Sequence, residues 1–383
     1  MSFENNQEVM DEEQAAFQIH LRNTIGADNV HAYVTGTDIQ RGHLFFLRAD
    51  GKTPYYPKNP PSDGAPLEHD CAIKLGSSNS ATPITIPHLK SGRIYFVVGK
   101  LIFSLNHDEG GPALVTPSPF ELGTKNHNVK WSFAEFTWNA DNLYANISFQ
   151  DYVGLPIALT LKTTSGNTQH VAGLPANGVS TVCKRLEHVD HDHADWAKLV
   201  MKSSQGEYLR AITPFNGMQL QPGLFDGYYE KYVDKVWEKY KDTPLLVNTA
   251  APGKLKGHVV NEVLKVGGET FTKPSTADIF GNNSGPFANE GSQERKDIIP
   301  LLCAAFNRST LLEDHETPDP NGRQDYYKAT TTNYYAKIIH DVLPDGRGYA
   351  FAYDDVKPAG AKDQSGRVQS SSPKLLIMTV GGQ

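Results

Sequence analysis

The chain has 383 residues, of which 39% are hydrophobic and 10% aromatic, so it can bury a core either in two lobes or in one large domain. Its 43 Asp and Glu outnumber its 36 Lys and Arg, which gives a net charge of −7. Because the sequence has no basic cluster, this balance argues against a nucleic acid or an anionic membrane as partner, and a neutral or cationic ligand fits better.

The N-terminal residues 1–16 are polar and acidic, and we expect them to be frayed. Met1 to Gln18 contains no apolar segment of the kind that signal peptides carry, and no run in the chain approaches the ~18 apolar residues of a membrane-spanning helix. We therefore expect no membrane span. Export would need a leader outside this sequence, and the alternative is a protein that works inside the cell.

The three cysteines, Cys71, Cys183 and Cys303, are odd in number and widely separated. At most one intramolecular disulfide could form among them, so disulfides do not define this fold.

Residues 17–187 consist of short β-prone runs separated by Gly, Pro, Asn and Asp. Regularly spaced short strands with turn residues between them are typical of a β-sandwich or β-barrel. The clearest runs are HAYVTGTD (31–38), HLFFLRADG (43–51), ITIPHL (84–89) and RIYFVVG (93–99).

The most informative stretch, Trp131 to Leu161, predicts a β-hairpin with turn residues around Asn139. Side chains alternate faces along a strand, so Glu135, Thr137 and Asn139 project together while Phe136 and Trp138 face a core. A carboxylate, a hydroxyl and an amide on one face are groups that bind a polyhydroxylated ligand.

The register of this hairpin decides whether Asp151, on the second strand, shares a face with Glu135. A loop of Ala140 to Tyr144 would place Glu135 opposite Phe149. Asp151 would then be the same-face diagonal neighbour of Glu135, ~7–8 Å away.

Histidines and aspartates are crowded within residues 188–195. Such a set could bind a transition metal, but its spacing matches no zinc motif, and the alternation would place neighbouring ligands on opposite sides of an extended chain. We predict no metal here and favour a solvated connection between two lobes. The residues concerned are His188, Asp190, His191, Asp192, His193 and Asp195.

The pattern within residues 188–342 changes to helical periodicity and predicts a mixed α/β lobe. After it, residues 343–383 predict strands that return to the first lobe, so the β domain, 17–187 and 343–383, is discontinuous. The predicted elements are a helix capped by Asp226 and reaching Tyr240, strands within Lys256–Gly268, helices at Ser292–Arg308 and Tyr326–Val342, and strands at Tyr349–Val356 and Lys374–Val380.

Several of these stretches resemble a known family. AEFTW (Ala134–Trp138) followed by NISFQDYVGLP (Asn146–Pro156) is similar to the AEF…S-x-V-D…LP signature shared by thaumatin-like proteins and by glycoside hydrolase family 64, the inverting endo-β-1,3-glucanases. Further stretches fit the hydrolase branch, in the expected order: Ser91–Leu105, Ser275–Phe287, Ala304–Leu311 and Asn333–Val356.

The resemblance implies a mainly β fold, with a thaumatin-like β-barrel or sandwich lobe, an inserted α/β lobe and a wide groove between them. It implies β-1,3-glucan as partner and short laminari-oligosaccharides, laminaripentaose among them, as products, and it implies no cofactor. We expect a monomer that acts outside the cell, because the presumed substrate is a wall polymer.

Hydrolysis of a glycosidic bond needs one protonated carboxylic acid and one ionised carboxylate, and Glu135 and Asp151 supply the pair. Glu135 is flanked by Trp131, Phe133 and Phe136, and apolar neighbours favour the protonated form, so it is the predicted general acid and Asp151 the general base. From spacing alone, two solvated acids on an ordinary sheet are the alternative.

The predicted substrate-binding residues surround this pair. Arg93 resembles the arginine that lines the cleft of thaumatin-like proteins, and it could instead make a structural ion pair. Asp354 and Asp355 face the same cleft in the resemblance, with a Lys-paired surface turn as an equally weighted alternative. The full predicted set is Arg93, Thr137, Asn139, Tyr144, Asp354 and Asp355.

One position departs from the thaumatin-like pattern. These proteins often carry a further cleft acid in the strand before Asp151, and here that position is Asn146, which indicates a differently tuned cleft. The alternative function is a non-catalytic thaumatin-like β-glucan-binding protein that keeps the groove and the acids but misplaces the base.

Overall fold

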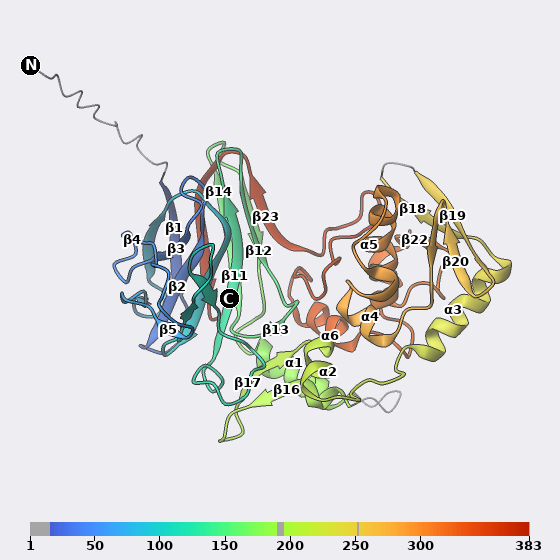
Figure 1. The fold of residues 1–383 in the computed structure, drawn as a ribbon, viewed down its shortest axis with the longest axis horizontal. Coiled ribbons are helices and arrows are strands. Elements are labelled where there is room, and N and C mark those ends of the chain that lie inside the picture. Colours follow the sequence, from blue (N-terminus) through green and yellow to red (C-terminus); the bar gives the residue numbers. More distant parts are fainter. Residues whose placement is uncertain (1–15, 190–194, 251–252, 383) are drawn as a thin grey trace, which may run out of the picture.

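The computed structural model describes residues 16–189, 195–250 and 253–382. Figure 1 shows two lobes that diverge from a shared base. The left lobe contains β-sheets built from both ends of the chain, and the right lobe is built from a later, internal part of the chain. The fold is mainly β with a mixed α/β lobe, as the sequence predicted. The expectation for residues 1–16 falls almost wholly outside the described residues.

Two sheets face each other in the left lobe. Phe17 of one sheet lies against Trp138 of the other, with ring centroids 5.2 Å apart, so the core fills the space between them. The first sheet has the order β15 (Thr168–Val171), β14 (Ile157–Thr163), β24 (Pro373–Val380), β1 (Phe17–Asn23) and β7 (Ala81–Ile86). The second has the order β23 (Gly366–Ser370), β12 (Leu143–Ile147), β11 (Trp131–Trp138), β8 (Leu89–Val98), β2 (Val30–Asp38), β3 (Leu44–Leu47) and β4 (Pro54–Tyr55), with β6 (Ile73–Lys74) beside β2.

A smaller sheet lies at the edge of this lobe, and two more sheets belong to the rest of the chain. The small edge sheet has the order β10 (Ala113–Val115), β9 (Ser104–Asn106) and β5 (Ala65–Pro66). A second three-stranded sheet has the order β13 (Tyr152–Val153), β17 (Tyr208–Ile212) and β16 (Val200–Lys202). The last sheet has the order β21 (Glu269–Phe271), β20 (Val263–Val266), β19 (Lys254–Val260), β18 (Leu245–Asn248) and β22 (Glu316–Thr317). The strands predicted within Lys256–Gly268 are confirmed as β19 and β20.

The helices lie in the base and in the right lobe (Figure 1). They are α1 (Gly178–Glu187), α2 (Pro214–Leu220), α3 (Glu230–Asp242), α4 (Thr276–Gly281), α5 (Gln293–Arg308) and α6 (Tyr334–Val342), with 3₁₀ turns at Trp196–Leu199, Gly285–Phe287 and Gly322–Gln324.

Two of the three predicted helices needed corrected starts. The helix α5 begins after Ser292, whose side chain accepts a hydrogen bond from the Arg295 N–H, as a residue that caps a helix does. By contrast, α3 is preceded by Tyr229 instead of Asp226. The predicted helix from Tyr326 is wrong in its first part, because α6 begins only after Asn333, which accepts from the Ala336 N–H.

The C-terminal segment returns to the left lobe through β23, which pairs with β12, and β24, which lies between β14 and β1. The strand predicted at Lys374–Val380 is confirmed. The one predicted at Tyr349–Val356 is wrong, because those residues form turns. The Asp354 side chain accepts a hydrogen bond from the Ala350 N–H, and such local bonding competes with strand pairing.

Cys71, Cys183 and Cys303 are all buried free thiols. No helix in the described residues is both long enough and apolar enough to cross a membrane. Within residues 16–189, 195–250 and 253–382, no group of His, Cys, Asp and Glu side chains is arranged to hold a metal ion. Most of the His/Asp run, residues 190–194, lies outside the described residues.

Candidate active site

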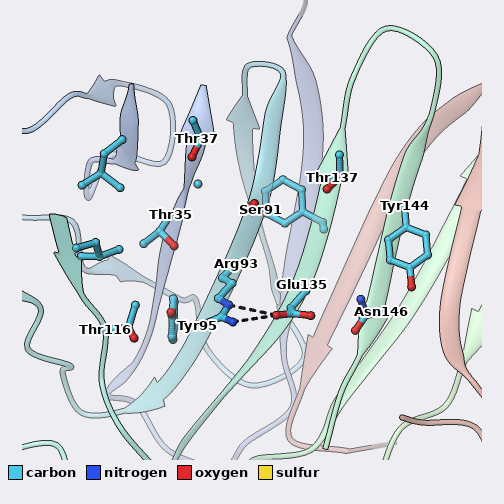
Figure 2. A pocket seen from close by; sticks show the side chains of 15 residues that line it. Thr35, Thr37, Ser91, Arg93, Tyr95, Thr116, Glu135, Thr137, Tyr144 and Asn146 are labelled. Carbon is cyan, nitrogen blue, oxygen red and sulfur yellow. Dashed lines mark hydrogen bonds and ion pairs between the residues drawn. The ribbon is translucent and has the colours of Figure 1, made fainter. Parts of the chain in front are cut away.

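A row of polar side chains crosses the second sheet. In the adjacent strands β2, β8, β11, β12 and β23, the register partners are Thr35, Arg93, Glu135, Asn146 and Arg367. Directly opposed residues share a face of the sheet, so all five project to the same side. Figure 2 shows the first four of them across the floor of a pocket.

This pocket is an open cavity of ≈ 470 Å³ on the face of the sheet that turns away from the core. Glu135 and Thr137 both border it, and the burial along β11 confirms the predicted alternation, because these two side chains are partly exposed while Phe136 and Trp138 are buried. Sequence analysis did not identify several polar lining residues, although alternation on neighbouring strands would have found them once the strand order was known. They are Thr35, Thr37, Ser91 and Tyr95; Thr116, which follows β10 of another sheet, and Asn146, which the sequence singled out, line the cavity as well.

Arg93 and Glu135 form an ion pair at the centre of the row. The Arg93 Nε and Nη2 donate to the same oxygen, Glu135 Oε1, at 3.2 and 3.1 Å. The Arg93 guanidinium also lies over the Phe133 ring, 4.6 Å from its centroid. Both charged side chains remain about one-third exposed, at 35% and 37%. Pairs this accessible are worth about 0–1 kcal/mol, so an entering ligand can replace this one at little cost.

The predicted hairpin is present, but its predicted register is wrong. Glu135 lies opposite Asn146 and not Phe149, because the turn is shorter than expected. The Asn139 side chain closes it by accepting hydrogen bonds from the backbone N–H groups of Asp141 and Asn142, each at 2.9 Å. The strand β12 ends at Ile147, so Asp151 is not a diagonal neighbour of Glu135 on the sheet.

Asp151 instead follows an irregular segment at the junction of the two lobes. The Tyr335 hydroxyl of α6 donates to the Phe149 carbonyl at 2.6 Å. The Asp151 carbonyl accepts from the Thr213 N–H and from the Asn216 Nδ2 at the start of α2, at 3.2 and 3.0 Å. These bonds fix the backbone on both sides of Asp151, whose side chain borders a second cavity of ≈ 240 Å³.

The two acids belong to one electrostatic site although they line different cavities. The Asp151 side chain reaches solvent, but the protein around it raises the pKa of its carboxyl; Arg93 opposes this shift and the charge of Glu135 adds to it. The structure thus couples Asp151 to the Arg93–Glu135 pair, as a site with two interacting carboxyl groups requires.

Thr137 and Tyr144 form the next pair along β11 and β12, and both line the first cavity. The Tyr144 hydroxyl also lies near Tyr349 and helps to raise its pKa. Asn139 is not among the lining residues, and its amide oxygen is used by the turn. The structure therefore brings Thr137 and Tyr144 to the site and leaves Asn139 at its margin.

The two aspartates of the Tyr349–Val356 segment lie in opposite environments. Asp354 is fully buried between Arg308 and His340, so the expectation that it contacts substrate is wrong, and it is not a Lys-paired surface residue either. Asp355 is exposed, and its charge interacts with Tyr349, the neighbour of Tyr144. Although the side chain reaches solvent, the protein around the Asp355 carboxyl raises its pKa, and Arg367 opposes this shift.

Comparison with known proteins places this site in a family. Residues 15–380 match the model of glycoside hydrolase family 64, described as β-1,3-glucanase. A glucan endo-1,3-β-glucosidase of Cellulosimicrobium cellulans is 28% identical over 307 residues, which are 76% of this chain and 53% of that protein. A second, from Arthrobacter sp. strain YCWD3, matches with the same identity and coverage. The chain thus spans about half the length of the curated relatives it matches.

Solved structures agree with the family match. A laminaripentaose-producing β-1,3-glucanase in complex with laminaritetraose superposes with a TM-score of 0.83 at 29% identity, covering 96% of this chain and 98% of the other. A β-1,3-glucanase domain from Clostridium beijerinckii, at 22% identity and a TM-score of 0.73, shares the fold over 95% of this chain and 98% of that one. This chain belongs to glycoside hydrolase family 64, the β-1,3-glucanases.

Proposed function

We propose that this protein is an endo-acting β-1,3-glucan hydrolase in which Glu135 is the general acid and Asp151 the general base. The observation that carries the proposal is that Arg93 and Glu135 lie together on a cavity lined by hydroxyl, amide and aromatic groups, with their charges acting on Asp151 at the second cavity. The similarity to a laminaripentaose-producing enzyme that binds laminaritetraose supports a short laminari-oligosaccharide as product.

In the reaction, the Glu135 carboxyl gives its proton to the glycosidic oxygen while the bond from that oxygen to the anomeric carbon breaks. The Asp151 carboxylate takes a proton from a water molecule whose oxygen bonds to the same carbon. Arg93 holds the Glu135 side chain on the cavity floor, and it stabilises the carboxylate that remains after proton transfer.

We infer that the anomeric configuration is inverted. The register on which the sequence argument for inversion depended is wrong, but a different observation supports it. Glu135 and Asp151 border two separate cavities, and no direct hydrogen bond between them occurs in the described residues. Inverting enzymes keep their carboxyl groups about 6.5–9.5 Å apart to admit a water, whereas retaining enzymes hold them about 5–5.5 Å apart.

The first test is the release of reducing sugar from laminarin or curdlan, with cellulose, a β-1,4-glucan, as the control polymer. We expect release from the β-1,3-glucans, with the α-anomer appearing first in the NMR spectrum of the products. Binding to curdlan without release would favour the alternative, a non-catalytic glucan-binding protein. Release with the β-anomer first would keep the hydrolase and reject inversion.

The second test concerns the cavity wall. Tyr144→Ala should weaken the binding of a laminari-oligosaccharide by about 0.5–1.5 kcal/mol, because it removes the aromatic plane opposite Thr137. Titration calorimetry with the Glu135→Gln protein measures this without turnover. Phe120→Ala, which removes another partly buried ring that does not line the cavity, is the control. Equal affinities in the two variants would place the sugar elsewhere.

We also propose that the protein is a monomer that acts outside the cell, since a wall polymer cannot reach a site within it. Light scattering checks the first statement and fractionation of a producing culture the second.

A further inference from the structure

Asn146 is a buried amide in the wall of the active site, and it has no role in the reaction proposed above. It is 8% exposed, and its Oδ1 has no hydrogen-bond partner in the described part of the chain. A buried polar atom without a partner costs free energy and is rare in folded proteins. Because Asn146 lines the catalytic cavity, a group within that cavity can supply the partner.

The two residues beside Asn146 in the row limit which group can be its hydrogen-bond partner. Asn146 lies between Glu135 on β11 and Arg367 on β23. Arg367 is already paired with Asp363 at 3.3 Å. On the other side, directly opposed side chains have Cβ atoms about 4.5–5.5 Å apart, which a Glu and an Asn can bridge by a hydrogen bond. In the resting structure Arg93 donates to Oε1 of Glu135, and the Glu135 carboxylate lies between Arg93 and Asn146 (Figure 2).

We propose that Asn146 is a positioning residue for the general acid: its Oδ1 accepts a hydrogen bond from the protonated carboxyl of Glu135 when Glu135 leaves Arg93. The inference rests on the proposed role of Glu135. A hydrogen bond made only to the protonated form favours that form, whereas the bonds from Arg93 favour the ionised one. Glu135 thus lies between a cation on β8, which donates hydrogen bonds to its carboxylate, and an amide oxygen on β12, which can accept a hydrogen bond only from its protonated form.

The same geometry explains why an amide suits this position. Glu135 already interacts with the charges of Arg93 and Asp151, and Arg367 lies beyond Asn146. A carboxylate at position 146 would add a second negative charge directly opposite Glu135, which would hold the Glu135 proton more tightly and slow its transfer.

The test is the pH dependence of kcat/KM on laminarin for Asn146→Ala and Asn146→Asp. The alkaline limb reports the pKa of the group that must be protonated, Glu135. Without the acceptor, Asn146→Ala should move this limb to lower pH by about half a unit or more, and the like charge of Asn146→Asp should move it to higher pH by about one unit. The control is Asn167→Asp, which adds a charge on an exposed hairpin of the other sheet.

Opposite displacements in the two variants, with the control unchanged, would support the inference. Limbs that coincide with that of the original protein would overturn it, even if kcat fell, since a packing role changes no pKa. The proposed function is tested separately by Glu135→Gln. An active Glu135→Gln protein would reject the acid itself, whereas an inactive Glu135→Gln protein together with unmoved limbs in the two Asn146 variants would reject only the part played by Asn146.

Discussion

Glu135→Gln is expected to reduce the turnover of β-1,3-glucan at least ~10²-fold, because an amide has no proton to give to the leaving oxygen. The fold should remain intact. The change removes an ion pair in which both partners are about one-third exposed, and such pairs contribute little to stability. Reducing-sugar release under saturating laminarin measures the loss.

Asp151→Asn should reduce turnover by a similar factor, with a different effect on stability. The protein around the Asp151 carboxyl raises its pKa above the usual value of 3.8. The stability that the protonated carboxyl contributes is therefore fully present below pH 3.8, and it is lost as the pH rises through the folded-state pKa. At pH 7 the charged carboxyl is a cost to the fold, and Asp151→Asn should unfold at the same urea concentration as the original protein or a higher one. The two midpoints should converge below about pH 4.

The matched control is Asp141→Asn, an exposed carboxylate in the turn of the same hairpin. It should retain full turnover and unchanged stability. Turnover near that of the original protein in either catalytic variant would remove that residue from the mechanism. A loss of turnover accompanied by a large loss of stability would mean that the variant acts through the fold.

The parts of the site that the sequence predicted are those that local rules control. Period-two alternation places Glu135 and Thr137 on one face, and Ser292 caps its helix by contacts within four residues. The sequence indicates that Asn139 lies in a turn, but it does not show how many residues the turn contains. The turn is shorter than predicted, and this difference changes the register of the hairpin. A register depends on one turn, and a short error there moves every pair along both strands.

The parts that were mispredicted depend on contacts distant in sequence. Asp151 is placed by Tyr335, Thr213 and Asn216, none of which can be linked to it from spacing. Likewise, Asp354 and Asp355 are adjacent in the sequence, but Asp354 is buried and Asp355 is exposed. The difference depends on Arg308 and His340, which are distant in the sequence or on another element and which bond to Asp354 and not to Asp355. A motif can contain both aspartates without showing which one is exposed.

Asp354→Asn is expected to be the most destabilising of the changes considered. The Asp354 Oδ1 accepts from Arg308 Nη2 at 3.0 Å, and its Oδ2 pairs with His340 Nε2 at 2.7 Å and accepts from the Ala350 N–H at 2.8 Å. The side chains of Asp354, Arg308 and His340 are all 0–3% exposed. Removing one partner of a buried pair leaves the other charge uncompensated, which costs about 3–5 kcal/mol.

The pH dependence of this contribution has a definite sign. Burial alone would raise the pKa of Asp354, but His340, Arg308 and the Ala350 N–H together hold it below its usual value. A lowered pKa gives stability that is present above the unfolded-state value of about 4 and is lost as the pH falls. The difference in the free energy of unfolding between the original protein and Asp354→Asn should therefore be largest near neutral pH and should shrink in acid.

The same network reaches the catalytic residues, so Asp354→Asn should also lower turnover in the fraction that folds. Asp354 fixes the Ala350 N–H, and the neighbouring Tyr349 carbonyl accepts from the Phe149 N–H at 2.7 Å, two residues before Asp151. Asp355→Asn, the adjacent exposed carboxylate, is the control for stability and should unfold within about 0.5 kcal/mol of the original protein. Equal urea midpoints for the two variants would contradict the role of the buried network. A less stable but fully active Asp354→Asn protein would separate that network from the position of Asp151.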